Sequence, residues 1–359
     1  MIDIFPFVQV GEYIRKIEKY EDFTVYQSVE FLKLFRRSLN FRIIGFRPEF
    51  NSIGKKYYVA SQRIHGKYCC VLPFQYDKKK NEISFIGDQK QLNNAYYNHD
   101  LFIYDRFVEL LNFIFEKYKG CVIKLINMSP RTLFFGYLSK YITNNAVKVE
   151  KYWETTCVSV HIYNNNADDW FASLSKSTRQ NIRTSYNRIK TDNKQIEIKH
   201  LRGEQITSDV IRQAMRLQRK RNLEKRSMSF GSFTKFICIV GGWLSMLNIR
   251  TKMLLQSESS YLSVLYIDNQ MAAFVAGYLS PDGRFYIPFL KYNTDFSRYN
   301  PGAIVINESI RWLCASDYNL QEYDLLTGEE QYKYSYGGKK YSNINVYMKM
   351  NETILFSPS

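Results

Sequence analysis

Apolar and polar residues alternate along three neighbouring segments in the first half of the chain. These segments are 56–64, 67–76 and 81–88, and short polar stretches such as HGK and DKKKN separate them. The pattern predicts a meander of antiparallel strands. Around the meander the apolar spacing predicts a helix at 29–39, and afterwards a helix at 104–120, a strand at 121–128 and a helix at 129–142.

The second half repeats this loose rhythm of helices, strands, helix and strand. It opens with a strand at 155–163 and a helix that begins near Asn166 or Asp168 and runs to 190. The later pattern predicts a strand at 195–201, helices at 206–226 and 232–247, strands at 261–268, 271–280 and 284–292, a helix from about Gly302, and strands at 322–327 and 343–350.

Helices on both faces of a mixed, mostly antiparallel sheet are the natural packing for this order of elements. The length of 359 residues favours two domains, and the change of pattern places their boundary near residue 160. We therefore expect an α/β (α+β) protein with two domains in tandem, 1–160 and 161–359, each a central sheet flanked by helices.

The composition is that of a folded protein with an anionic partner. Apolar residues make up 45% of the chain, which is ample for a core. The formal net charge is +16, and residues 176–226 alone hold 15 Lys or Arg against 5 Asp or Glu. This balance favours phosphate-bearing ligands, nucleic acid or a membrane surface.

Several classes of protein are disfavoured by the sequence. It has no signal-peptide pattern and no apolar run of the ~18–20 residues that a membrane helix needs. Its six cysteines fit neither a zinc site nor a secreted disulfide framework, so we expect reduced thiols, a cytoplasmic location and no metal. Glycine-rich nucleotide loops and a nucleophile elbow are also missing.

Two arginines of the basic stretch stand four residues apart on the helix that runs to 190. Arg179 and Arg183 therefore share one helix face. Guanidinium groups suit phosphate and carboxylate recognition. A solvated basic face without a dedicated ligand explains the same pattern equally well.

The loop 293–303, between a strand and a helix, is a second candidate anion site. Its turn contains Pro301 and Gly302 at the start of the helix, with Arg298 just before it. The N–H groups at a helix start bind phosphate readily. An ordinary loop capped by Asn300, with Pro301 as the first helical residue, is the alternative.

The order of elements and this turn resemble the Gcn5-related N-acetyltransferase (GNAT) fold. In that family the pyrophosphate of acetyl-CoA lies on the turn between the fourth strand and the third helix, within the pattern Q/R-x-x-G-x-G/A. Here the turn reads RYNPGA from Arg298 to Ala303. The Arg and the last Ala match, Pro301 replaces the first Gly, and Gly302 follows one place later.

Three blocks between about 150 and 340 more closely resemble the CelD-type acetyltransferases of cellulose and exopolysaccharide synthesis. The blocks are LSKSTRQNIRTSYNRIK, KYNTDFSRYNPGAIVINESIRWL and YDLLTGEEQYKYSYG. They match that family's arginine-rich helix, its Tyr-x(n)-Ser-Pro-Gly turn with Asn300 in place of Ser, and its Asp-x-x-x-Gly-x-x-x-Tyr-Lys motif. The matching residues are Arg179 and Arg183, then Tyr292, Tyr299, Pro301 and Gly302, then Asp324, Gly328, Tyr332 and Lys333.

The segment TVYQSVEFLKLF near the start of the chain resembles the same proteins and the related FemX-type peptidyl transferases. Both groups carry two GNAT-like domains in tandem, of which the first is often degenerate. The resemblance therefore implies a catalytic GNAT domain at 161–359 behind a GNAT-like domain at 1–160.

The resemblance also implies a bacterial acyl-CoA-dependent N-acyltransferase, with acetyl-CoA as the simplest donor. The amine of an amino sugar or another envelope or exopolysaccharide precursor attacks the thioester directly in this fold. Asp324 is expected to be the base or the amine-binding residue, ahead of Glu329 and Glu330, and Tyr332 to protonate the thiolate or stack on a sugar. Arg298, Tyr299, Pro301, Gly302 and Ala303 are expected to bind acyl-CoA, and Arg179, Arg183, Tyr292 and Lys333 an anionic small-molecule or lipid-linked acceptor.

Other interpretations stay open. Asp324 as a turn or cap residue and Tyr332 as an ordinary tyrosine of an amphipathic strand explain the same positions structurally. A FemX-like transferase that uses aminoacyl-tRNA also fits, and the basic charge favours it. A third alternative is a non-catalytic binder of nucleic acid or of the inner membrane surface through 176–226. A peripheral membrane contact is compatible with the acyltransferase as well.

Overall fold

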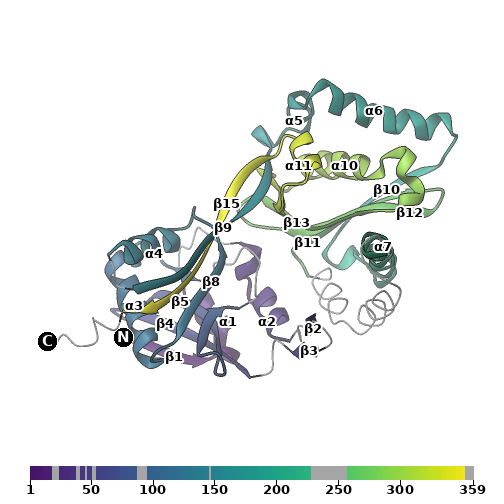
Figure 1. Cartoon of the computed structure of the whole chain (residues 1–359). Helices are drawn as coiled ribbons and strands as arrows, with labels where there is room; N and C mark the ends of the chain where they lie inside the picture. The colour runs from purple at the N-terminus through teal and green to yellow at the C-terminus, as the bar shows by residue number, and fades with distance from the viewer. Residues whose placement is uncertain are drawn as a thin grey trace. The chain divides into compact units, whose positions relative to one another are not determined.

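The structure, a computed structural model, divides the chain into two compact units (Figure 1). It describes residues 1–17, 24–37, 41–44, 47–50, 54–86, 95–144, 147–227 and 257–351. Unit 1 takes in the described residues of Met1–Leu39, Phe50–Thr156 and Ser342–Ser359, and unit 2 takes in those of Asn40–Glu49 and Cys157–Tyr341. The predicted helix at 232–247 lies outside the described residues.

Unit 1 is built on a sheet with the strand order β1-β4-β5-β6-β8-β15. Neighbouring strands are antiparallel except β6 and β8, which are parallel and are connected through α3. Its elements are β1 (Ile2–Pro6), α1 (Val10–Arg15), α2 (Val29–Arg37), β4 (Lys55–Ile64), β5 (Lys67–Asp77), β6 (Glu82–Phe85), β7 (Tyr96–Tyr97), α3 (Tyr104–Lys117), β8 (Val122–Met128) and α4 (Leu133–Thr143).

Unit 2 repeats this topology with the strand order β10-β11-β12-β13-β14-β9. Only β13 and β14 are parallel, and α10 connects them. Its elements are α5 (Ala167–Ser173), α6 (Lys176–Thr191), β10 (Ile196–Arg202), α7 (Ser208–Ser227), β11 (Ser260–Ile267), β12 (Gln270–Leu279), β13 (Arg284–Tyr292), α10 (Pro301–Ala315), β14 (Glu322–Thr327) and α11 (Gln331–Ser335), and β2 (Phe41–Ile44) pairs separately with β3 (Arg47–Phe50).

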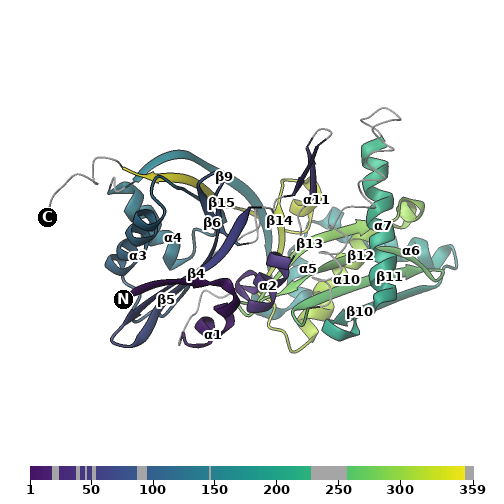
Figure 2. The same cartoon turned by 90° about the horizontal axis from the view of Figure 1, so that it is seen from below.

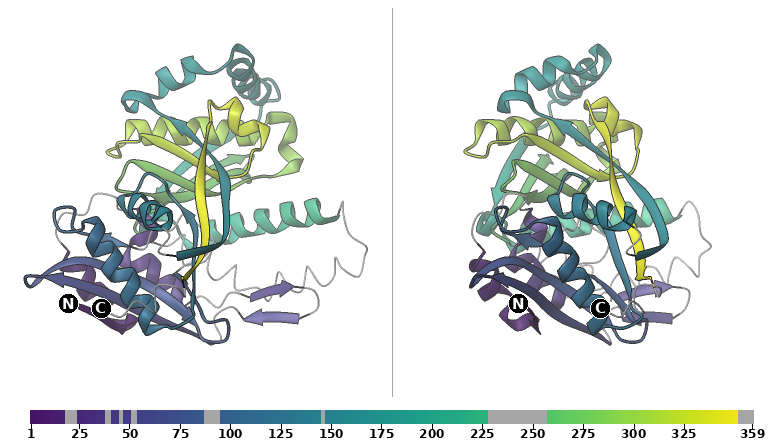
Figure 3. Two further views of the ribbon diagram at one scale, coloured as in Figure 1. Left: turned by 60° about the vertical axis from the view of Figure 1, so that its left-hand side comes forward. Right: turned by 90° about the vertical axis from the view of Figure 1, so that its left-hand side faces the viewer.

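The last strand of each sheet comes from the other half of the chain. β9 (Val147–His161) follows α4 of unit 1 and pairs with β14, whereas β15 (Lys339–Met350) follows α11 of unit 2 and pairs with β8. The two long strands are neighbours (Figure 3). The sequence places 342–350 in the second domain and the boundary near 160, whereas in the structure this exchange of strands joins 342–350 to the sheet of unit 1.

Helices cover both faces of the sheet in unit 2. β11 directs Tyr261 and Leu265 into a core shared with α6 and α10, and directs Leu262 and Val264 into a second core shared with α7. Adjacent strand residues point to opposite faces, so a strand buried on both faces reads as an apolar run. Mixed, mostly antiparallel sheets flanked by helices are therefore confirmed.

Two elements of unit 2 differ from the expected ones. The helix predicted from 166 to 190 is broken at Leu174, because Ser175 starts a new helix by accepting a hydrogen bond from the Thr178 amide at 3.1 Å. The segment 328–338, for which the sequence predicted no regular element, contains the short helix α11.

Candidate functional site

Two strands of unit 2, β13 and β14, are neighbours in the sheet (Figure 2) and pair in parallel. They pair at three positions, of which the last joins Tyr286 to Asp324. β13 continues to Tyr292 alongside β12 after this pair. The two strands therefore part after Tyr286 and Asp324.

Local features of both strands explain the parting. Pro288, two residues beyond Tyr286, has no N–H group and cannot extend a ladder. Leu326, two residues beyond Asp324, has φ 58, which takes β14 out of the extended conformation. The β12–β13 register shifts at Gly277, where an added Cβ would lie 2.0 Å from the Tyr286 carbonyl oxygen. Pro288, Leu326 and Gly277 therefore explain why the two strands part at this place.

The start of α10 has the features of an anion-binding site, which we call the anion seat. Asn300 precedes it with φ 45 and makes no capping hydrogen bond through its side chain, so the alternative of an ordinary Asn300 cap is not what the structure contains. Pro301 is the first helical residue, and the first turn has no acidic residue. A Cβ on Gly302 would find its nearest neighbour, Tyr292 Cδ1, at 3.7 Å. The N–H groups and dipole of this helix start favour a bound anion.

The residues just before this seat are held by the end of α6. The Asp192 carboxylate accepts bonds from Arg298 Nε at 2.9 Å and Nη2 at 3.2 Å, and from the Tyr299 hydroxyl at 2.9 Å. These bonds lower the pKa of Asp192. Arg188 Nη1 donates to the Arg298 carbonyl oxygen at 2.9 Å. The predicted Arg298 therefore lies at the seat, and α6 fixes its position.

Asp324 lies at the point of parting and has no exposed surface. Its Oδ1 accepts the Leu326 amide at 2.8 Å, and its Oδ2 accepts the Tyr341 hydroxyl at 2.6 Å. Burial raises the pKa of Asp324 to about 6, against the lowering effect of these two hydrogen bonds. A carboxyl group with a pKa near neutrality is able to take up a proton during a reaction.

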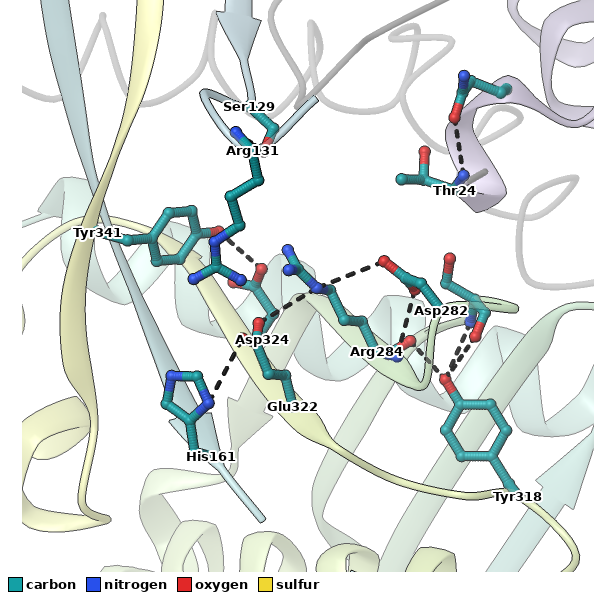
Figure 4. A network of polar contacts seen from close by, with 12 residues as sticks. Thr24, Ser129, Arg131, His161, Asp282, Arg284, Tyr318, Glu322, Asp324 and Tyr341 are labelled. Carbon is teal, nitrogen blue, oxygen red and sulfur yellow. Dashed lines mark hydrogen bonds and ion pairs between the residues drawn. The ribbon is translucent and has the colours of Figure 1, made fainter. Parts of the chain in front are cut away.

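Further charged groups surround Asp324 at the beginning of β13 and β14 (Figure 4). Arg284 Nε lies 3.2 Å from Glu322 Oε2 and 3.4 Å from Asp282 Oδ2. His161 Nδ1 lies 3.5 Å from Glu322 Oε1. The Arg284 guanidinium lowers the pKa of Asp324, while Glu322 raises it. The pKa of Asp324 therefore depends on the charges of Arg284 and Glu322.

Lys333 and Asp324 hold the same turn from two sides. The Lys333 side chain is 2% exposed, and Nζ donates to the carbonyl oxygens of Leu326 at 3.3 Å, Thr327 at 2.7 Å and Gly328 at 3.1 Å. Gly328 has φ 103, a conformation that favours glycine. The Asp-x-x-x-Gly-x-x-x-Tyr-Lys motif is therefore one structural turn, and the Lys333 ammonium binds main-chain oxygens within it.

Tyr332 is the exposed member of the same motif. It lies on α11 and is 39% exposed, and desolvation raises its pKa to about 12. The two neighbouring acids are engaged in ion pairs, Glu329 with Lys340 and Glu330 with Lys333 at 3.0 Å. Tyr332 therefore keeps its proton at neutral pH and presents it at the surface.

The two arginines predicted to bind the acceptor lie at the start of α6. Arg179 donates to the Ala172 carbonyl oxygen of the preceding helix. The Arg183 guanidinium lies 5.8 Å from the centre of the Phe171 ring. Arg183 is exposed, so its charge stays available to a ligand, whereas Arg179 also joins α5 to α6.

Sequence reasoning missed Tyr341, Arg284 and Glu322. Tyr341 is 17 residues from Asp324 and reaches it only because β15 enters unit 2. Arg284 and Glu322 stand at the first positions of their strands, where a charged residue reads as an edge residue. The glycine inside the strand 271–280 was the one available signal of an irregular sheet at this place.

Within the described ranges no group of three His, Cys, Asp or Glu side chains is placed to hold a metal ion. Of the helices in those ranges, none is long and apolar enough to cross a bilayer.

Comparisons with known proteins agree with the fold. Residues 176–334 match the family model described as an acetyltransferase (GNAT) domain. A conserved protein of unknown function from Bacteroides thetaiotaomicron VPI-5482 is similar in structure, with 13% identity over 97% of this chain and 99% of that chain and a TM-score of 0.52. FemX is similar with 10% identity over 99% of this chain and 98% of that chain and a TM-score of 0.60. A search of curated proteins finds no match. The predicted GNAT domain is thus confirmed, which indicates an acyltransferase in general terms.

Proposed function

We propose that unit 2 is an acyl-CoA-dependent N-acyltransferase, with acetyl-CoA as the simplest donor. The observation that carries this proposal is that parallel β13 and β14 part at Tyr286 and Asp324, while β13 runs on to Tyr292 at the anion seat of α10. In the GNAT fold this turn receives the pyrophosphate of acyl-CoA. Arg298, Tyr299, Pro301, Gly302 and Ala303 are the residues that we assign to this role.

The spacing along β13 suits an extended donor. Six residues separate Tyr286 from Tyr292, which at ~3.3 Å per residue is roughly 20 Å. An arm that starts at the α10 seat beside Tyr292 must cover this distance to bring its thioester to Asp324. The pantetheine arm of CoA is a linear chain of this kind, so the seat and the carboxyl group stand at the two ends of one donor.

The reaction that we propose is a direct transfer. The acceptor amine attacks the thioester carbonyl, the new C–N bond forms, the C–S bond breaks, and the amine loses one proton while the thiolate gains one. We assign the first proton to Asp324, through the hydroxyl of Tyr341: the amine proton moves to Tyr341 Oη as the Tyr341 proton moves to Asp324 Oδ2. We assign the second proton to Tyr332.

The acceptor that we propose is an amino sugar or another anionic envelope precursor. Arg179 and Arg183 on α6 are the residues proposed to bind its phosphate or carboxylate groups, and Tyr292 a sugar ring. For Lys333 the three main-chain contacts favour a positioning role in the turn after Asp324 over contact with a diphosphate.

The experiment is a thiol-release assay with acetyl-CoA and a panel of amino sugars and nucleotide-linked amino sugars. We expect kcat to rise with pH through about 6, as Asp324 ionises, and to fall by about 100-fold or more in both Asp324→Asn and Tyr341→Phe. Tyr332→Phe should lose about 10-fold or more by the same principle. The matched control is Tyr163→Phe, a 66% exposed tyrosine remote from these residues in the sequence.

Full activity in Asp324→Asn and Tyr332→Phe together would show that the chemical assignment is wrong. Absence of acetyl-CoA binding by calorimetry would show that the donor is wrong. The second candidate is then a FemX-like transferase that uses aminoacyl-tRNA, which the similarity to FemX over 99% of this chain favours. Binding of tRNA with no binding of acetyl-CoA would decide for it.

A further inference from the structure

We propose that a cluster of lysines at one end of unit 1 docks the protein on an anionic phospholipid surface. The cluster is defined by Lys55, Lys56, Lys78, Lys79, Lys80, Lys117 and Lys119, hereafter the lysine cluster. All of them are exposed except Lys55, which is half-buried. This inference concerns unit 1 and does not depend on the function proposed for unit 2.

Three segments that are distant in sequence meet at this end of the sheet. The first residues of β4 pair with the last residues of β5, so that Lys55 stands opposite Asp77. The turn after β5 contacts the end of α3, because Asn81 Nδ2 donates to the Lys119 carbonyl oxygen at 3.1 Å. The rings of Tyr76 and Tyr118 lie 4.6 Å apart in the same place. The lysines are therefore held on one surface by ordered structure.

The cluster carries an unbalanced positive charge. Within the part of the chain that the structure describes, none of its seven lysines forms an ion pair. The carboxylate of Asp77 accepts the main-chain amides of Lys79 and Lys80 at 3.0 and 3.2 Å, and Glu82 lies 3.7 Å from Lys124, outside the cluster. Glu116 is the remaining acid in these segments.

The arginines of unit 2 differ from these lysines. In the basic stretch 176–226, Arg202 pairs with Asp317, Arg221 pairs with Glu224, and Arg179 donates to a carbonyl oxygen. The richest basic stretch of the sequence is therefore partly engaged within its own unit. The lysine cluster, which is spread over three stretches of sequence, presents its charge to solvent.

Tyrosines next to the lysines favour a lipid surface over a nucleic acid. Tyr58, Tyr76 and Tyr118 are half-buried. The Tyr118 ring packs on Tyr58 and Tyr76, with ring centres 6.2 and 4.6 Å apart, and also on Phe74. Single-stranded nucleic acids bind by stacking bases on free aromatic faces, which these packed rings do not offer. Tyrosine and lysine together are typical of the membrane interface, and anionic headgroups attract clustered lysines.

The experiment measures sedimentation of the full chain with vesicles of phosphatidylcholine alone or with ~30% phosphatidylglycerol. We expect binding to the anionic vesicles only, and a decrease with added salt. The test variant Lys78→Gln/Lys79→Gln/Lys80→Gln should bind about 100-fold more weakly, at about fivefold for each lysine near the surface. Its control, Lys148→Gln/Lys176→Gln/Lys190→Gln, removes three exposed lysines elsewhere and has the same net charge.

The outcomes distinguish an effect of where the positive charge lies from an effect of the total net charge. Loss in the test variant with retention in the control supports the proposal. Equal loss in both variants, or no binding of the wild type to anionic vesicles, overturns it. Salt-sensitive binding of an RNA hairpin that the test variant alone loses, without vesicle binding, would assign the cluster to RNA instead. The thermal unfolding midpoint, measured in parallel, should be the same in both variants and the wild type, which shows that the variants are folded.

Discussion

The two units share one strand order and one parallel crossover, yet their corresponding sites differ in charge. In each unit the parallel pair starts at the first residues of both strands, so that by register Asp324 on β14 corresponds to Lys124 on β8. α10 begins with Pro301 after an Asn300 of positive φ, whereas α3 begins after the extended Ile103 and carries Asp105 in its first turn. A carboxylate at that place repels the anion that the start of α10 attracts.

Buried charges follow the same division. The fully buried charged side chains among the described residues, Glu322, Asp324 and Lys333, all belong to unit 2. The buried polar side chains of unit 1 are amides and a serine. Burying a charge costs free energy unless it is paired, and a raised pKa such as that of Asp324 is typical of functional sites. One scaffold thus occurs twice, and among the described residues its buried charged groups lie in unit 2.

The largest effect should come from the irregularity in the sheet of unit 2. In Gly277→Ala the new Cβ would lie 2.0 Å from the Tyr286 carbonyl oxygen, so strand β12 or β13 must move. We expect a loss of about 3 kcal/mol in the free energy of unfolding of unit 2, measured by chemical denaturation.

The matched variant in unit 1 is Gly136→Ala, on α4, where an added Cβ meets nothing within 4 Å. It should leave stability unchanged or raise it by up to ~1 kcal/mol, because alanine favours the helix. Equal stability of the two variants would mean that the bulge at Gly277 does not constrain the parting of β13 and β14.

The second effect is a pH dependence that Asp324 gives to unit 2. Because the pKa of Asp324 is raised to about 6 in the folded protein from an ordinary 3.8, the folded state holds this proton more tightly than the unfolded state. Its contribution to stability is full below about pH 4 and is lost as the pH rises through about 6. The expected change is roughly 3 kcal/mol, at about 1.4 kcal/mol for each pKa unit.

Asp324→Asn is the variant that isolates this change. Its amide oxygen can accept the Leu326 N–H, and its NH₂ can donate to Tyr341, so the turn is retained. Denaturation of the wild type and the variant between pH 4 and 7 should show the loss in the wild type only. A pH dependence that is the same in both would place the responsible group elsewhere.

The strands and helices could be predicted from the sequence better than the contacts around Asp324 could. Apolar periodicity and turn residues identify the strands and helices because these depend on neighbours a few residues away. Pro301 and Gly302 are likewise local signals. The role of Lys333 could not be predicted. The sequence around a lysine does not differ between one that binds a ligand and one that donates to three main-chain oxygens. The exchange of β9 and β15, which brings Tyr341 to Asp324, is a tertiary event without any local signature.

The third prediction introduces into unit 2 the acidic residue that unit 1 has in the first turn of α3. Gly302→Asp places in the first turn of α10 the charge that Asp105 places in α3. Repulsion from a bound anion should raise the Kd of acetyl-CoA about 30-fold, which corresponds to ~2 kcal/mol, by calorimetry. Asp105→Asn should not change this Kd. If both variants bound acetyl-CoA like the wild type, the α10 start would not be the donor site.

The smallest effect concerns the contacts between Asp192, at the end of α6, and the residues just before α10. Asp192→Asn removes the carboxylate that pairs with Arg298 and accepts the Tyr299 hydroxyl, so Arg298 loses its fixed position beside the bound anion. This ion pair is largely exposed on the Arg298 side, and such pairs contribute little, so we expect only about a threefold rise in the Kd of acetyl-CoA. The matched control is Asp268→Asn, because Asp268 pairs with Lys194 at 2.6 Å on another loop of the same unit. A rise of the same size in both variants would reduce the effect to lost surface charge, whereas a rise in Asp192→Asn alone would show that α6 positions Arg298 for the donor.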